Sequence, residues 1–285
     1  RPSCWPPTSR RADCSAVSAC YHSPTMRIAM GIEYDGSNFC GWQRQRTGRT
    51  VQGCLEQAVA SVADHKLSVV CAGRTDTGVH ATAQVIHFDT GALRKPRSWV
   101  LGGNANLPAD IRIQWAQPVD EASQARYEAR RRHYRYVILN RDHDSAVLRN
   151  RVCWEFADLD VCCMREAAAQ LVGEHDFTSF RAVACQAKSP VRTVYQLEVT
   201  RQGQFVYLDI SANAFLHHMV RCIAGVLLSI GRGDQPPDWA REILRAKDRT
   251  QGGVTAPAGG LYLVAVRYPG RYAVPDRGWL PAYGC

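Results

Sequence analysis

A short loop that carries one carboxylate between two glycines is the stretch best suited to chemistry. It spans Gly73–Ala81 and has the sequence GRTDTGVHA. Glycine adopts backbone angles that other residues avoid, so we expect a tight turn that can hold Asp76 at the edge of a sheet. An aspartate in a glycine-bounded turn is, however, more often only a turn former. Asp76 and His80 are four residues apart and could share a metal ion, but Gly78 argues against the helix that would bring them together.

A second candidate site is a run in which cations alternate with aromatic rings, Tyr127–Tyr136 (YEARRRHYRY). Aromatic rings stack on bases and arginines bind phosphates, which is the combination that a base-binding surface needs. The period of a strand would place Tyr134 and Tyr136 on one face and Arg135 on the other. The alternative is a strand with a solvated basic face. The candidate RNA-binding residues of this run are Arg130, Arg131, Arg132 and Arg135.

The third candidate is Ala214–Arg221 (AFLHHMVR), which opens an apolar stretch that predicts a helix from about residue 215 to residue 230. Arg221 is a cation in this otherwise uncharged stretch, and burying a cation without a partner is costly, so we expect it to pair with a carboxylate. His217 and His218 could be ligands. Adjacent residues on a helix point about 100° apart, however, so each is expected to be an ordinary core or surface histidine.

The composition is that of a folded, basic protein. The chain has 285 residues, of which 46% are hydrophobic, and its formal net charge is +9. This content excludes a disordered chain, and no apolar run reaches the length of about 18 residues that predicts a membrane span. Of the 35 lysines and arginines, 31 are arginine. Arginine binds phosphate bidentately and stacks on bases, so nucleic-acid binding is one interpretation; the arginine bias of a GC-rich genome is the other.

The twelve cysteines of the chain form no closely spaced pair of the CxxC type. A structural zinc site needs such pairs, and a disulfide scaffold is typical of a short secreted chain. We therefore expect reduced thiols, a cytoplasmic protein and no metal site.

Strand-like and helix-like segments alternate from Met26 onward and predict an α+β fold with a sheet on one side and helices on the other. Thr50 is expected to cap the first helix and Asp158 or Asp160 the second. The predicted strands are 28–34, 67–72, 83–88, 133–139, 191–200, 204–211 and 261–268, and the predicted helices are 51–62, about 160–171, 215–230 and 239–246.

Four segments are expected along the chain. Residues 1–25 contain four prolines, five serines and no periodic apolar pattern, and we interpret them as a disordered or artefactual extension. Residues 26–125 form an N-terminal half that carries the Asp76 loop. Residues 126–270 form a C-terminal half, and residues 271–285 form a tail.

Taken together, these blocks resemble the bacterial tRNA pseudouridine synthase A family over roughly residues 27–270. The similar blocks occur in the same order as in that family, and a series of this kind is far more specific than one motif. They are Met30–Gln45, Cys71–Ala81, Gly103–Pro108, Ala129–Leu139, Phe177–Arg181, Asn213–Arg221 and Gly260–Val266.

The resemblance implies an isomerase that converts uridines 38, 39 and 40 of the tRNA anticodon stem-loop to pseudouridine. It implies that Asp76 is the essential catalytic residue, that Tyr134 stacks on the uracil, and that Arg74 and Arg221 belong to the substrate site. It further implies a homodimer that binds tRNA, needs no metal or organic cofactor, and has an extended, mostly antiparallel sheet built from two similar halves.

Two alternatives from other classes remain open at this point. One is an RNA-binding module without chemistry that uses only the arginine and tyrosine surface. The other is a metal-dependent hydrolase that uses Asp76, His80, His217 and His218. The intact carboxylate loop together with Tyr134 and Arg221 favours the isomerase.

Overall fold

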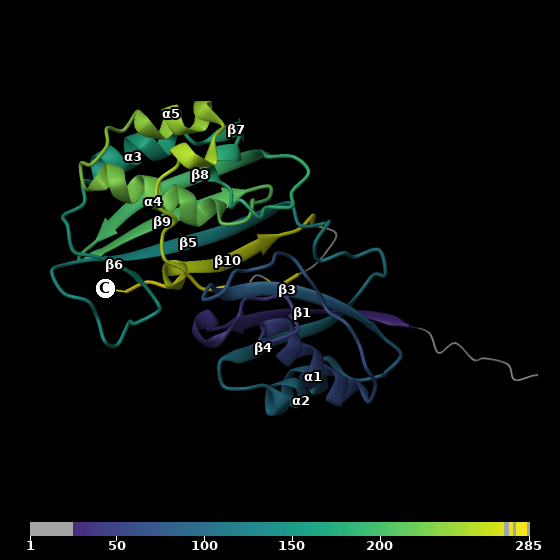
Figure 1. Ribbon diagram of the computed structural model, residues 1–285. Coiled ribbons are helices and arrows are strands. Elements are labelled where there is room, and N and C mark those ends of the chain that lie inside the picture. The colour runs from purple at the N-terminus through teal and green to yellow at the C-terminus, as the bar shows by residue number, and fades with distance from the viewer. Residues whose placement is uncertain (1–24, 271–273, 276–277, 284–285) are drawn as a thin grey trace, which may run out of the picture.

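The computed structural model describes residues 25–270, 274–275 and 278–283, so the expected extension lies outside the described residues except for Thr25. The described residues form one sheet flanked by helices (Figure 1). Its strands are β1 (Met26–Tyr34), β2 (Val70–Cys71), β3 (His80–Thr90), β4 (Ile111–Val119), β5 (Arg131–Asn140), β6 (Cys153–Glu155), β7 (Gly173–Asp176), β8 (Val191–Gln202), β9 (Phe205–Ala212) and β10 (Leu261–Arg267). The helices are α1 (Val51–Ala63), α2 (Pro96–Asn106), α3 (Val161–Ala169), α4 (Met219–Gly231) and α5 (Trp239–Ala246).

The last strand of the chain lies in the middle of the sheet. The strand order is β4-β1-β3-β10-β5-β9-β8-β7, with β2 paired to β3 and β6 paired to β5. All pairs are antiparallel except β10 with β3 and β5 with β6. The predicted α+β class and the mostly antiparallel sheet are therefore confirmed. Because β10 pairs with β3 on one side and β5 on the other, it joins strands of the two expected halves.

The helices bury one face of the sheet in a single apolar core. The alternation along β1 sends Ile28, Met30 and Ile32 into this core, where each is at most 2% exposed. Figure 1 shows α1 and α2 beside β1 and β4, and α3, α4 and α5 grouped over β8 and β9. The predicted helix caps are confirmed: Thr50 Oγ1 accepts from the backbone N–H of Gly53, and Asp160 caps α3.

The opposite face of the sheet is covered by loops and by part of the expected tail. Tyr207 on β9 donates its hydroxyl hydrogen to the backbone carbonyl of Tyr283. The backbone carbonyl of Trp279 accepts from Thr82 Oγ1 at 2.8 Å, and a Cβ on Gly278 would lie 2.3 Å from the backbone oxygen of Val264. The described residues 278–283 therefore pack against the sheet.

Several elements differ from the predictions. Helix α2 was not predicted, because Gly102 and Gly103 weaken its helical pattern; they are needed where Val62 and Ile113 approach closely. Strands β4, β6 and β7 were also missed. The predicted strand 67–72 pairs only at Val70–Cys71, and α4 begins at Met219 instead of residue 215. No helix among the described residues is long and apolar enough to span a membrane.

Candidate active site

The Asp76 loop connects β2 to β3 and is held by two side chains from outside the loop and by a backbone hydrogen bond within it. The hydroxyls of Tyr34 and Thr75 are hydrogen bonded at 2.7 Å in a buried position. Gln84 on β3 donates to the backbone carbonyl of Gly73 and also contacts its N–H. The N–H of Val79 donates to the carbonyl of Asp76 and closes the turn. The loop is therefore tightly shaped, as expected. The carboxylate of Asp76 is partly exposed within it.

Two glycines allow a second loop, residues 35–49, to pack directly on the backbone of the Asp76 loop. A Cβ on Gly36 would lie 2.0 Å from the carbonyl oxygen of Val79. Gly41 has a φ of +82°, and its Cβ would lie about 3 Å from Thr75 and Thr77 backbone atoms. The N–H of the next residue, Trp42, donates to the carbonyl of Thr75 at 3.0 Å. These contacts hold the backbone on both sides of Asp76 against the backbone of the loop of residues 35–49.

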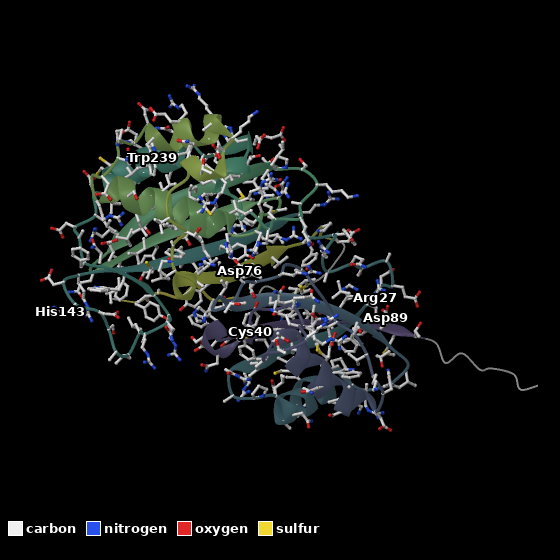
Figure 2. All side chains as sticks on the ribbon, viewed as in Figure 1. Arg27, Cys40, Asp76, Asp89, His143 and Trp239 are labelled. Carbon is white, nitrogen blue, oxygen red and sulfur yellow. The ribbon has the colours of Figure 1, made fainter. Side chains whose placement is uncertain are left out.

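Three cationic or ionisable side chains surround the carboxylate of Asp76: two histidines directly before α4 and an arginine in its first turn. His217 Nε2 lies 3.3 Å from Oδ1, and His218 Nε2 lies 3.5 Å from Oδ2. Arg221 Nη1 lies 3.8 Å from Oδ2, while its Nε donates to the carbonyl of Ala256 at 2.8 Å. The structure thus brings Asp76 and Arg221 together. Figure 2 shows Asp76 near the middle of the molecule, between the two groups of helices.

The two histidines converge because they do not lie on a helix. His218 has a φ of +64° in the left-handed region, and it precedes the first residue of α4. This turn cancels the angular separation that a helix would impose, so both imidazoles face one carboxylate. The expectation of two ordinary histidines is therefore wrong. The signal in the sequence was their position close before Arg221, in the first turn of the predicted helix.

The surroundings shift the pKa of two groups beside Asp76. Burial lowers the pKa of His218, an effect that outweighs the opposing attraction of Asp76, and Arg221 adds to the lowering. Burial raises the pKa of Tyr134, and the charge of Asp76 raises it further. The Tyr134 phenol therefore stays protonated at neutral pH.

Tyr134 lies on β5 in the core under the Asp76 loop. Tyr134 lies on the face of the sheet that the helices cover, and the residue is 8% exposed. Its ring meets that of Phe215 edge to face with centroids 5.0 Å apart. Its hydroxyl lies near Gly73, because a Cβ on that glycine would be 3.8 Å from it. Arg74, in contrast, is exposed.

The arginines of β5 and its approach fall into two groups. Arg130 and Arg131 are exposed, and Arg131 lies over the ring of Tyr195. Arg132 is partly buried and uses all five of its N–H groups on backbone carbonyls, those of Ala72, Arg126, Ala129 and Asn213. Arg135 lies on the opposite face from Tyr134 and forms a bidentate ion pair with Asp209 at 2.7 Å. RNA contacts of Arg132 and Arg135 stay a prediction, and both guanidinium groups already have hydrogen-bond partners within the protein.

His80 does not join the other residues of the candidate metal set. Its Nδ1 accepts from the N–H of Gly36, and its Nε2 donates to the carbonyls of Asn150 and Gly259. Its ring stacks on Tyr262 with centroids 4.6 Å apart. The structure separates His80 from the metal set but keeps Asp76, His217 and His218 together, with their ligand atoms within 4.8 Å of one another.

Comparisons with known proteins agree on one family. A family model described as tRNA pseudouridine synthase matches residues 30–128 and 167–269. The tRNA pseudouridine synthase A of Nitrosococcus oceani is 62% identical over 250 residues, which are 88% of this chain and 96% of that protein. The protein of the same name from Alcanivorax borkumensis is 55% identical over 260 residues, 90% of this chain and 97% of that protein.

A more distant relative and one solved structure complete the comparison. The tRNA pseudouridine synthase A of Coxiella burnetii is 53% identical over 249 residues, which are 87% of this chain and 95% of that protein. A chain of a solved Cbf5-Nop10-Gar1 complex is similar over 70% of this chain and 45% of that chain, with a TM-score of 0.31 and 13% identity. A likeness that weak supports no conclusion about this chain.

Proposed function

Because the chain belongs to the tRNA pseudouridine synthase A family, and is therefore an isomerase, we propose that it converts uridines 38, 39 and 40 of the tRNA anticodon stem-loop to pseudouridine with Asp76 as the essential catalytic residue. The positions are those that the resemblance of the sequence blocks implies. The observation that carries the catalytic proposal is the partly exposed carboxylate of Asp76 in a rigid loop, with a cation and two imidazoles around it.

The reaction exchanges one bond of the uridine for another. The C1′–N1 bond breaks, the uracil rotates, a C1′–C5 bond forms, and the proton leaves C5 while N1 gains one. A carboxylate can begin this sequence by adding to the sugar or base, or by removing the 2′ proton to give a glycal. Either step uses the carboxylate of Asp76 as nucleophile or base, and Arg221 Nη1 lies 3.8 Å from its Oδ2.

Tyr134, Arg221 and Arg74 have separate roles in this proposal. Tyr134 limits the movement of the uracil by stacking, and its protonated phenol suits it to donate a hydrogen bond. The guanidinium of Arg221 faces the carboxylate of Asp76. The carbonyl of Ala256 accepts a hydrogen bond from Arg221 and keeps it in this position. The exposed Arg74 fills the space that the flipped nucleotide leaves. Extruding a base costs a few kcal/mol, which stacking and phosphate contacts offset.

We expect Asp76→Asn to remove turnover and keep tRNA binding. Tritium release from tRNA labelled at uracil C5 should fall by at least about a thousandfold, because the amide cannot act as nucleophile or base. Affinity for tRNA should stay within a few-fold of the wild type. Asp142→Asn, at an exposed carboxylate on the loop after β5, is the control and should keep full activity. Loss of tRNA binding by Asp76→Asn would make Asp76 structural and contradict the proposal.

Chelation separates the isomerase from the metal-dependent hydrolase. Tritium release that survives EDTA supports the isomerase, since none of its proposed steps uses a metal ion. Loss of activity in EDTA would favour a metal-dependent reaction at Asp76, His217 and His218. Mapping pseudouridines in tRNA before and after treatment with the enzyme tests the three positions.

The proposal also includes a homodimer that acts in the cytoplasm, as the resemblance implies. Analytical ultracentrifugation of the purified chain, with and without tRNA, measures the mass of the assembly. Fractionation of cells that produce the protein at natural levels tests its location.

A further inference from the structure

The carboxylate of Asp76 and the two imidazoles have the geometry of a metal site as well as that of a catalytic cluster. Two ligand atoms bound to a tetrahedral Zn²⁺ at about 2.0–2.1 Å lie about 3.3–3.4 Å apart. The observed distances from the carboxylate oxygens of Asp76 are 3.3 Å to His217 Nε2 and 3.5 Å to His218 Nε2. These two nitrogen-to-oxygen distances are close to that spacing, and the ligand atoms of all three residues lie within 4.8 Å of one another.

We propose that Asp76, His217 and His218 bind a divalent transition-metal ion of the Zn²⁺ class and that this binding inhibits the enzyme. The inhibition rests on the proposed function, because the ion would occupy the carboxylate that the reaction needs. The metal site itself stands on the geometry alone.

The chemistry of the ligands selects the class of ion. Two imidazole nitrogens and one carboxylate suit Zn²⁺, Co²⁺ or Cu²⁺, whereas Mg²⁺ and Ca²⁺ prefer oxygen ligands. The side chains of Asp76, His217 and His218 are 24%, 42% and 29% exposed, so an ion can enter and a water molecule can complete the coordination. A low millimolar Mg²⁺ concentration, as used with tRNA, should therefore leave the site free.

Arg221 limits the affinity of the proposed site for a metal ion. Its Nη1 lies 3.8 Å from Asp76 Oδ2, so its positive charge opposes that of the ion. Its Nε is held by the carbonyl of Ala256, which keeps the guanidinium beside the site. Arg221→Gln should therefore bind the ion more tightly than the wild type does, a change in the direction opposite to that of the histidine variants.

A Co²⁺ titration of the tRNA-free protein tests the site without any reaction. Tetrahedral coordination gives strong visible absorption, and thiolate ligation by a cysteine would add a separate charge-transfer band in the near ultraviolet. We expect the visible bands in the wild type and in His143→Gln, whose histidine is on an exposed loop at the edge of the molecule (Figure 2). His217→Gln and His218→Gln should each bind on the order of tenfold more weakly or worse.

Inhibition is then measured as a fraction of each variant's own metal-free rate. Added Zn²⁺ should suppress tritium release by the wild type and by His143→Gln, and EDTA should restore it. The His217→Gln/His218→Gln double variant should resist Zn²⁺ at the concentration that halves the wild-type rate. Equal Zn²⁺ sensitivity in the double variant, or unchanged Co²⁺ affinity in both single variants, would overturn the proposal.

The Co²⁺ titration and the tritium-release assay distinguish a failure of the metal site from a failure of the proposed function. A protein that binds Co²⁺ through the three residues but releases no tritium without metal would contradict the isomerase proposal and keep the metal site. A protein that is active without metal and whose histidine variants bind Co²⁺ as the wild type does would contradict only the metal site.

Discussion

Arg132 illustrates how a side chain can position the candidate site without entering it. Its guanidinium binds the carbonyl of Ala72, directly before the Asp76 loop, and that of Asn213, directly before the segment that carries the two histidines. It also binds the carbonyls of Arg126 and Ala129. The planar fork of arginine can reach all of these carbonyls at once, which the single ammonium of lysine cannot. Arg132 therefore ties together the two segments that must meet at Asp76.

Arg132→Lys separates a positioning role from a phosphate contact. We expect kcat to fall by about tenfold or more while tRNA affinity stays within a few-fold, because about 1–3 kcal/mol of buried hydrogen bonding is lost around the site. A phosphate contact would instead lower affinity and reduce the slope of log K against log salt. Arg131→Lys at the neighbouring exposed position is the control and should keep kcat. Single-turnover rates and filter binding at several salt concentrations measure both quantities.

His87 on β3 makes the stability of the protein depend on pH. It is 4% exposed, and its Nδ1 accepts from the N–H of Ala125. Burial lowers the pKa of His87 from 6.5 to about 4, and the charge of Arg27 adds to this effect. Between these values the unfolded chain binds the additional proton, so the free energy of unfolding decreases as pH falls through this window.

His87→Gln should reduce that pH dependence. Between pH 7.5 and pH 5 the buried histidine accounts for about 2 kcal/mol of lost stability, which the variant should not show. Urea unfolding at the two pH values provides the comparison, and His143→Gln serves as the exposed control. An equal loss in wild type and His87→Gln would mean that other groups carry the acid sensitivity.

At the scale of elements, the site depends on two loops that pack backbone against backbone. The loop of residues 35–49 touches the Asp76 loop at Gly36 and Gly41, where any side chain would meet main-chain atoms. Main-chain atoms cannot move aside as the end of a flexible side chain can. The close contact therefore makes the position of Asp76 a property of both loops.

Gly41→Ala should disturb both stability and catalysis, and Gly233→Ala is its matched control. Both glycines have positive φ, +82° and +78°, but a Cβ on Gly233 meets nothing within 4 Å. Gly233→Ala should cost only the backbone strain of about 1–2 kcal/mol and keep kcat. Gly41→Ala adds close contacts with backbone atoms of Thr75 and Thr77. It should therefore lower the free energy of unfolding by more than Gly233→Ala does, and it should lower kcat. Thermal unfolding and tritium release test this, and equal effects of the two substitutions would contradict the account.

At the scale of the whole molecule, the placement of β10 explains why the site forms between distant parts of the chain. This strand pairs with β3, which follows the Asp76 loop, and with β5, which carries Tyr134. The segment of residues 252–257 just before it also holds Arg221 through Ala256. Three segments widely separated in sequence are thereby fixed around one carboxylate.

The excess of positive charge predicts a steep salt dependence of tRNA binding. The chain has a net charge of +9, and Arg74, Arg130 and Arg131 are exposed near the candidate site or on the approach to β5. Each phosphate contact should lower log K by about 0.7–0.9 per unit of log salt. Replacing Arg130 and Arg131 by glutamine should make the slope of log K against log salt shallower by the amount expected for about two phosphate contacts. A slope that does not change in this double variant would exclude both residues from the RNA interface.

The sequence by itself determined the family, the α+β class and most elements of the fold. Alternating apolar residues, helix caps such as Thr50 and the ordered motif blocks are local features, so they can be recognised without knowledge of the fold. The Asp76 loop and Arg221 were found in this way. Helix α2 was missed because its glycines serve contacts with Val62 and Ile113, which no local pattern reveals.

Only the tertiary structure decided which side chains meet. The left-handed turn at His218 directs two imidazoles at Asp76, and the middle position of β10 joins β3 and β5 in one sheet. Arg132 connects separate segments of the chain, because the carbonyls that it binds lie up to 81 residues away in sequence. Such contacts depend on long-range packing, which selects one geometry among many that the same local patterns allow.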